Sequence, residues 1–550
     1  MQINKKIKYE MLPYREDRIK LIYLTEGSYG QIFLDKNKEY VYKITSFQHD
    51  KYIDIDNLIE LLYLNYFKKK YKNLYDKLEE NDFLPIQSVE SKIINFIDFN
   101  NLYEIENCSY KNQDNNYIIL NKLKYYKNNL FELIKNNPSN IFYDIDFIAK
   151  NIIKSLYIIN TNNLLHGDIK SYNIVYDYNQ CKLIDFGGLK PLYSNDYICT
   201  CTSTYRCPED LMYENNQINN YKNSDIKSDI WSLGIILLEI LIGYNPVNQI
   251  YNIYLNKIKD NRNNNLNTQE KNKKAEKMLC DTFMNDDYID VNAYYKSKYN
   301  KNYNLTNIDS CIINDSIRQL ENKNINYVTV IESMLQVNPD NRISSLEEIY
   351  KKLFNEELII PEIFNTNNEY NYETLLNNIK NENTKNNFKN FRNNNYKIII
   401  DFINKYLDKH ISLLTLNILD KYYINLINNI ENINEIIFLI HSNIYKNYLL
   451  VITMVAAISI SNCIIFRQVL DIHKINNQIF EFDLIKSSSI KYITKTMLTD
   501  EIINILVILN YDIIDINLDN HNIKNKISDS ELDILINEYI TNFSININKL

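Results

Sequence analysis

The chain has 550 residues, 45% of them hydrophobic, and a formal net charge of −8 at pH 7. This length exceeds what a single hydrophobic core supports and predicts two domains with linkers. The acidic balance excludes a generic nucleic-acid-binding protein, which would need a basic surface. The eight cysteines are scattered without paired spacing, so we expect reduced thiols in an intracellular, cytoplasmic protein. The excess of Asn, Ile, Lys and Tyr is typical of AT-rich genomes, such as those of large DNA viruses and protists, and a viral chain would act in the host cell cytoplasm.

The N-terminal region predicts a hairpin with a glycine-bearing turn. Residues 19–24 and 31–34 are apolar runs on either side of Gly27 and Gly30, and residues 40–44 form a third strand that carries Lys43. Backbone N–H groups in such a turn can lie over phosphates, and a strand lysine can hold them. The next segment, residues 54–69, has helical apolar spacing and places Glu60 where it could pair with that lysine. Taken alone, these features also fit an ordinary hairpin and a solvated glutamate.

The segment 164–187 carries the most specific chemistry. A loop follows the amphipathic stretch 145–159 and reads His-Gly-Asp-Ile-Lys-Ser-Tyr-Asn from 166 to 173. Asp168 is suited to accept the proton of a substrate hydroxyl, Lys170 to neutralise a transferring phosphoryl group, and Asn173 to bind Mg²⁺. Twelve residues later, Asp185 opens the sequence Asp-Phe-Gly and can chelate Mg²⁺ beside phosphates. Together with the hairpin, this order of residues predicts a phosphoryl-transfer site.

Residues 18–355 resemble the eukaryotic-type Ser/Thr protein kinases. Beyond the motifs above, Tyr-Arg-Cys-Pro-Glu at 205–209, Lys-Ser-Asp-Ile-Trp-Ser-Leu-Gly at 227–234 and Asn-Pro-Asp-Asn-Arg at 338–342 are each similar to a kinase element in the same order. The first of these is most similar to the group that contains cyclin-dependent and mitogen-activated kinases.

The resemblance implies an α+β bilobal protein kinase fold that transfers the γ-phosphate of ATP to protein hydroxyls. ATP and Mg²⁺ would be the cofactors, and proteins the substrates. The site residues would be Asp168 and Lys170 for catalysis; Leu24, Gly27, Gly30, Ile32, Lys43 and Glu60 for the nucleotide; and Asn173 and Asp185 for the metal. A pseudokinase scaffold is the alternative, although a scaffold needs none of the charged members of this set.

Further contacts follow from the resemblance, as do two departures from the family pattern. Arg342 is expected to pair with Glu209, and Thr202 to bond the catalytic aspartate and lysine. Thr25 stands where the first loop glycine is usual, and Gly167 replaces the arginine of His-Arg-Asp. That arginine normally clamps an activation-loop phosphate, so we expect another contact to hold the active conformation. Residues of about 256–304 are rich in Asn and Lys and predict a partly disordered insert.

The second half of the chain has no glycine and predicts helices. Residues 356–394 are polar and fit a linker, 395–515 contain helix-period segments, and 516–550 form a tail. Segments 398–403, 413–423, 449–466 and 500–513 are similar, in order, to helices of a cyclin box. The resemblance implies an all-α cyclin-like domain that could activate the kinase within the same chain. An unrelated helical domain, or a membrane-anchored kinase with a span at 449–466, remains the alternative.

Overall fold

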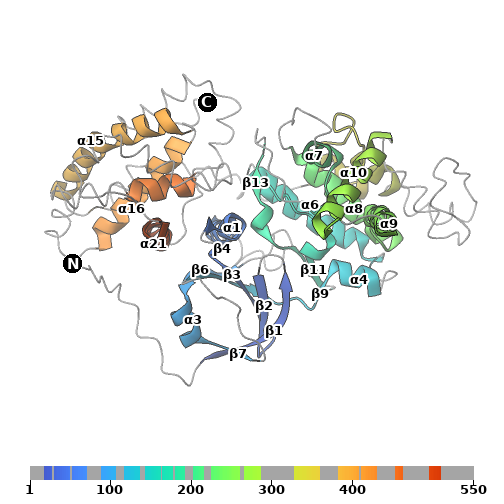
Figure 1. The fold of residues 1–550 in the computed structure, drawn as a ribbon, viewed down its shortest axis with the longest axis horizontal. Helices are drawn as coiled ribbons and strands as arrows, with labels where there is room; N and C mark the ends of the chain where they lie inside the picture. The colour runs from blue at the N-terminus through green and yellow to red at the C-terminus, as the bar shows by residue number, and fades with distance from the viewer. Residues whose placement is uncertain are drawn as a thin grey trace, which may run out of the picture. The chain divides into compact units, whose positions relative to one another are not determined.

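The computed structural model describes most of the regions that carry these motifs. The described residues are 18–27, 30–49, 52–70, 88–106, 117–136, 141, 143–162, 164–177, 180–192, 202–215, 225–260, 266–285, 327–358, 379, 382–407, 411–429, 452–461 and 495–509. Contacts divide the chain into two compact units, whose elements Figure 1 labels. The first unit comprises Met1–Lys72, Gln87–Tyr125 and Asn367–Leu550, and the second comprises Asn73–Ile86 and Tyr126–Thr366.

A six-stranded sheet with the order β6-β8-β3-β2-β1-β7 forms the centre of the first unit. The strands are β1 (Ile19–Gly27), β2 (Gly30–Asp35), β3 (Tyr40–Ser46), β6 (Ser88–Asn95), β7 (Tyr103–Glu106) and β8 (Tyr117–Lys124). Neighbours pair antiparallel except β1 and β7, which are parallel. The predicted hairpin and third strand are therefore present as β1 to β3. A two-stranded ribbon, β4 (Gln48–His49) with β5 (Tyr52–Ile53), follows.

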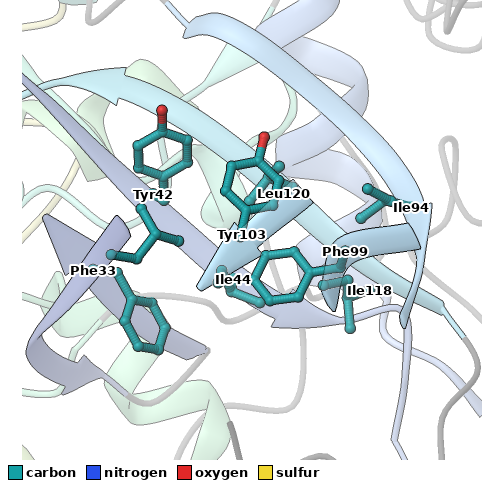
Figure 2. Packing of buried hydrophobic residues seen from close by; sticks show 9 residues of the cluster. Phe33, Tyr42, Ile44, Ile94, Phe99, Tyr103, Ile118 and Leu120 are labelled. Atoms are coloured by element: carbon teal, nitrogen blue, oxygen red, sulfur yellow. The ribbon is translucent and has the colours of Figure 1, made fainter. Parts of the chain in front are cut away.

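The sheet curls because a short helix joins its two edge strands. α3 (Phe96–Leu102) connects β6 to β7 with seven residues, which span about 10 Å, whereas six flat strands would separate those edges by about 24 Å. The apolar side chains that line the curled sheet form one cluster (Figure 2), which includes Phe33, Tyr42, Ile44, Phe99 and Tyr103. Phe99 and Tyr103 stack with ring centroids 4.9 Å apart. The closure over Phe99 makes this sheet a rigid support for the strands that carry Gly30 and Lys43.

The predicted helix at 54–69 is present as α1 (Ile55–Lys70). It packs against β6 and β8 of the sheet. Eight consecutive residues, 57–64, are buried, and because eight residues make more than two helical turns, every face of this part of α1 is covered.

Four helices are described in the C-terminal region: α15 (Glu382–Tyr406), α16 (Ser412–Asn429), a ten-residue helix over Ile452–Ser461 and α21 (Lys495–Ile508). The predicted linker at 356–394 is wrong at its end, because α15 begins at Glu382. Asn and Lys dominate this stretch and hide a helical pattern in which Phe388, Arg392 and Tyr396 recur every four residues and are buried.

Among the described residues, no single helix is long and apolar enough to cross a membrane, although the segments Ile226–Ile242 and Pro246–Lys259 pass that test as a pair bent by 90°. The predicted apolar segment 449–466 is described only over Ile452–Ser461, where every residue is buried.

The second unit is mainly helical. Its helices are α4 (Leu130–Asn136), α6 (Ile145–Thr161), α7 (Pro208–Glu214), α8 (Ile226–Ile242), α9 (Pro246–Asp260), α10 (Thr268–Asn285) and α13 (Leu346–Phe354). Its strands are β9 (Asn128–Asn129), β10 (Leu164–Leu165), β11 (Ile174–Asp177), β12 (Gln180–Leu183) and β13 (Lys190–Pro191), with 3₁₀ turns at η1 (Ser171–Asn173) and η2 (Phe186–Gly188). β12, β11 and β9 form one small sheet, and β10 pairs with β13.

α8 is the central helix of this unit, because every residue from Asp229 to Ile242 is buried. Gly234 lets the helix touch its neighbour closely, since a Cβ there would lie 2.8 Å from Leu335 Cδ2. The Asn- and Lys-rich insert predicted at 256–304 contains an ordered helix, α10, which packs against α7 and α9. The composition concealed that helix, whose apolar residues Ala275, Leu279, Cys280 and Phe283 are buried.

Candidate active site

The first unit contains the predicted pair of Lys43 and Glu60. Lys43 on β3 donates to both carboxylate oxygens of Glu60 on α1, with N–O distances of 3.0 and 2.8 Å. Asn121 on β8 donates to Glu60 Oε2 at 3.4 Å, a partner that the sequence did not indicate. The glutamate side chain is 3% exposed and that of the lysine 13%. The helix therefore fixes a cation that still reaches the surface.

The glycine turn lies at the end of the β1–β2 hairpin, where Gly27 pairs with Gly30. Gly30 has φ +155°, and a Cβ there would lie 2.6 Å from the carbonyl oxygen of Ile44 on β3. Only glycine fits so close an approach without displacing the neighbouring strand. Of the two apolar residues predicted to contact a nucleotide, Leu24 is 46% exposed and Ile32 is half-buried. Residues 28 and 29 lie outside the described part of the chain.

The second unit brings Asp168, Lys170 and Thr202 together. Lys170 Nζ donates to Asp168 Oδ2 at 2.6 Å and to Thr202 Oγ1 at 3.0 Å. Thr202 in turn donates to Asp168 Oδ1 from its backbone N–H at 3.0 Å and from its hydroxyl at 3.1 Å. The expected contacts of Thr202 are thus confirmed. The carboxylate is fixed on both oxygens, which orients it toward any hydroxyl that approaches the loop.

Asn173 and Asp185 are the two residues predicted to bind a metal. Asn173 Nδ2 donates to the backbone oxygen of Asp168 at 2.9 Å and to its Oδ2 at 3.3 Å, so the amide nitrogen is engaged and Oδ1 is the end suited to a cation. Asp185 lies in the left-handed region with φ +68°, a conformation that costs energy for any residue but glycine and often marks a functional turn. Among the described residues, no three His, Cys, Asp or Glu side chains form a metal site by themselves.

The loop at 166–173, which we call the catalytic loop, is held by a neutral histidine and a buried aspartate. Burial lowers the pKa of His166, and its Nδ1 accepts from the Asp168 N–H at 3.3 Å while Nε2 lies 3.2 Å from the Ile184 oxygen. Asp229 on α8 accepts from the N–H groups of His166 at 2.8 Å and Gly167 at 3.1 Å. A helix at the centre of the unit thereby fixes the loop backbone.

Two glycines permit close approach in this region. Gly167 has φ +76°, which suits glycine at the position where the family pattern has arginine. A Cβ at Gly188 would lie 2.9 Å from the His166 oxygen and 3.1 Å from Asp168 Cβ, so the turn after Asp185 lies directly against the catalytic loop. The sequence offered only a second glycine after Asp-Phe-Gly as a signal for this contact.

Residues 202–209, which correspond by resemblance to the end of a kinase activation segment, are fixed by the expected Arg342–Glu209 pair. Arg342 contacts both carboxylate oxygens at 2.7 and 2.9 Å, donates to backbone oxygens of Gln336 and Lys227, and lies 5.0 Å from the Trp231 ring centroid. The bidentate geometry makes this a strong contact.

The sequence did not predict a buried network of hydrogen bonds that links Tyr205, in the activation segment, to Ser171 in the catalytic loop. The Tyr205 hydroxyl donates to Glu239 Oε2 at 2.9 Å and lies 2.8 Å from Ser171 Oγ. Burial raises the pKa of Glu239 to about 7, against the hydrogen bonds from Tyr205 and Ser171 that lower it. Glu239 was the one acidic residue inside an otherwise apolar helical run from 230 to 242, and that isolation could have identified it.

The comparisons with known proteins agree with this geometry. The protein kinase domain family matches residues 67–355, which is just over half of the chain. The chain belongs to the protein kinase family. The match contains the catalytic loop, Asp185 and Arg342, whereas the glycine turn and Lys43 precede it.

Three of the relatives are named as protein kinases. "Probable serine/threonine-protein kinase PLK" of Dictyostelium discoideum is 28% identical over 159 residues, which cover 28% of this chain and 15% of the relative. "Probable serine/threonine-protein kinase MRK1 homolog" of Encephalitozoon cuniculi is 34% identical over 114 residues, or 20% of this chain and 34% of the relative. "Calcium-dependent protein kinase 4" of Plasmodium berghei is 28% identical over 240 residues, or 41% and 37%. The chain thus spans at most about a third of the length of the first two.

Proposed function

We propose that this chain is a Mg-ATP-dependent protein kinase that transfers the γ-phosphate of ATP to serine and threonine hydroxyls of proteins. The observation that carries the proposal is the network around Asp168, in which Lys170, Thr202 and Asn173 all donate to one carboxylate. The match to the protein kinase domain family and the names of the relatives support the same activity.

Each charged residue of the motifs has a chemical role in this proposal. Asp168 would accept the proton of the attacking hydroxyl, because its carboxylate is held in a fixed orientation by Thr202. Lys170 would place its charge beside the transferring group, and Lys43, held by Glu60, would bind phosphate oxygens. Phosphoryl transfer needs positioning and charge neutralisation more than covalent chemistry, and these residues supply both.

The donor set fits Mg²⁺. Asp185 offers a carboxylate and Asn173 an amide oxygen, and Mg²⁺ prefers hard oxygen ligands, of which the protein usually supplies one or two while phosphates supply more. Bound Mg²⁺ would neutralise charge on the phosphates. Asp185 would hold the metal ion from a turn that lies against the catalytic loop, where Gly188 permits the close approach.

Incubation of the full chain with Mg-ATP and a generic protein such as casein tests the activity. We expect phosphoserine and phosphothreonine in the hydrolysed product, and no transfer when EDTA removes the metal. Nucleotide binding without any transfer would instead identify a pseudokinase scaffold. Phosphotyrosine as the main product would contradict the assigned acceptor class.

We further propose that the C-terminal helices activate the kinase within the chain as a cyclin-like domain. Two observations support this: residues 57–64 of α1 are all buried, and the C-terminal region groups with α1 in the first unit. Cover on α1 would stabilise the Lys43–Glu60 pair. A flexible tether of a few tens of residues gives an effective concentration near millimolar, so a weak contact would suffice.

Truncation after residue 358 tests activation within the chain. We expect lower turnover and faster hydrogen exchange of α1 amides, with unchanged fluorescence of Trp231 as the control that the second unit remains folded. A truncated chain as active as the full chain, with α1 exchange unaltered, would contradict the cyclin-like role.

The kinship with cyclin-dependent and mitogen-activated kinases belongs to the same proposal and is supported by the Tyr-Arg-Cys-Pro-Glu sequence at 205–209. The proposed boundaries are 18–355 for the kinase domain and 382–515 for the helical domain. We also propose a cytoplasmic location, which is supported by Cys207 and Cys280, two buried thiols that form no disulfide.

A further inference from the structure

The position of Thr202 decides the orientation of Asp168, so whatever holds Thr202 matters for turnover. Thr202 is exposed and makes two hydrogen bonds to Asp168 Oδ1. Gly167 has no side chain with which the catalytic loop could anchor the segment through a phosphate. A contact that restrains the segment beside Thr202 would therefore help to keep these bonds in place.

The next residue along the segment supplies such a contact. The Ser203 hydroxyl donates to Glu276 Oε1 on α10 at 2.5 Å. A hydrogen bond to a charged acceptor is stronger than one between neutral groups, and Ser203 is only one peptide unit from Thr202. A restraint on Ser203 thus limits where the Thr202 N–H and hydroxyl can point.

α10 is itself firmly fixed in the second unit. Its residues Ala275, Leu279 and Cys280 are fully buried, and the Phe283 ring meets Trp231 of α8 edge-on with centroids 5.5 Å apart. The Thr282 hydroxyl lies 2.6 Å from that of Tyr254 on α9. Contacts to three helices (α7, α8 and α9) make α10 a rigid support for Glu276.

We propose that α10 holds the activation segment in its working conformation through the Ser203–Glu276 hydrogen bond, which makes Glu276 a positioning residue for Asp168. Glu276 acts through Ser203 and Thr202 and touches no reacting atom. The inference rests on the proposed kinase activity. In the family pattern an arginine at the position of Gly167 anchors the activation segment, and here α10, which composition predicted to be part of a partly disordered insert, takes that role.

The test uses the full chain with Ser203→Ala, Glu276→Met and the double variant, and Glu270→Gln as a control on the same helix. Methionine is close to glutamate in length but has no oxygen that could accept from Ser203. Glu270 is exposed on the same helix and accepts from the Asn267 N–H, a bond that glutamine retains. We expect each single variant to lower kcat about tenfold, with KM for ATP and the melting temperature unchanged. The double variant should lose no more than either single one, because both remove one contact.

Three results would overturn the proposal: wild-type kcat in both single variants, additive losses in the double variant, or an equal loss in Glu270→Gln. Hydrogen exchange of residues 202–207 separates this inference from the proposed function. If wild-type protein transfers no phosphate, faster exchange of these amides in Glu276→Met still supports α10 as the support of the segment, whereas unchanged exchange refutes it.

Discussion

Lys43–Glu60 and Arg392–Asp420 are both ion pairs between a cation and a buried carboxylate, and both lie in the first unit. In the second pair, Arg392 Nε lies 3.0 and 3.2 Å from the two Asp420 oxygens, the Tyr396 hydroxyl donates to Asp420 at 2.6 Å, and neither charged side chain is exposed. Lys43 instead keeps 13% of its side chain at the surface. The fully buried pair of Arg392 and Asp420 can only hold helices together. The pair of Lys43 and Glu60 can also bind an anion, because the lysine reaches the surface.

The largest expected effect is the loss of phosphoryl transfer when Lys43 is replaced, which tests whether the pair of Lys43 and Glu60 binds phosphate. Lys43→Met should lower phosphoryl transfer about 100- to 1,000-fold, since it removes a charge that neutralises phosphate oxygens, while Asn121 still donates to Glu60. Transfer rates and circular dichroism measure the two outcomes. Lys92→Met is the matched control, because Lys92 pairs with Glu90 on the same sheet at 2.7 Å. Near-normal transfer in Lys43→Met would remove Lys43 from the phosphate site.

Arg392→Met should act on stability instead. Removal of one partner from a buried ion pair costs about 3–5 kcal/mol, so the helices of the C-terminal region should unfold at lower urea concentration. Trp231, the single tryptophan, lies in the second unit, so its fluorescence should report an unshifted transition while far-UV circular dichroism reports the shifted one. Lys397→Met, at an exposed position of the same helix, should shift neither transition. Equal shifts of both probes in Arg392→Met would show that the two units unfold together.

Glu239 provides a pH-dependent version of the same comparison. Its pKa of about 7 lies above the ordinary 4.5, so the folded state binds more protons than the unfolded state between these values, and stability falls as pH rises through this window. We expect the stability of wild type relative to Glu239→Gln to fall by about 3 kcal/mol between pH 5 and 8.

Unfolding followed by Trp231 fluorescence measures that difference. Burial also raises the pKa of Asp229, which makes stability fall with rising pH, and lowers the pKa of His166, which makes stability rise with pH. Both groups are present in the two proteins, so their contributions cancel in the difference between wild type and Glu239→Gln. A difference that is flat with pH would show that Glu239 is ionised throughout the range.

The smallest expected effect concerns phosphate on the activation segment. Because Gly167 has no guanidinium and Glu276 holds Ser203 directly, phosphatase treatment should leave turnover unchanged. Alanine at Ser194 or Thr200, which lie outside the described residues, should be tolerated as well. A large loss after dephosphorylation would show that another basic residue binds a phosphate.

Local pattern predicted much of the kinase region. The helix with Glu60, the strand with Lys43 and the contacts of Thr202 are all present as the sequence indicated, because each depends on motif residues at fixed spacing. The pair of Arg342 and Glu209 was accessible for the same reason. Such motifs specify chemistry within a few residues of themselves.

Features that depend on distant pairing could not be predicted in this way. β7 pairs with β1 across about 80 residues of sequence, and no periodicity signals that register. Asn121 meets Glu60 across 61 residues. Asn and Lys are as frequent as apolar residues in α10 and outnumber them at the start of α15. Composition therefore indicated an insert and a linker, although each helix has buried apolar residues.

Phosphoryl transfer by the full chain, measured in parallel with Asp168→Asn, tests the central claim most directly. Asparagine keeps the size of the side chain, and its Oδ1 can still accept from Thr202. Its amide nitrogen can accept neither from Lys170 nor from the substrate hydroxyl. We predict that wild type phosphorylates serine or threonine of a protein substrate in the presence of Mg-ATP, and that Asp168→Asn folds normally but transfers at least about 100-fold more slowly. Equal rates in the two proteins, or no transfer by either, would contradict the assignment of Asp168 as the catalytic base of a protein kinase.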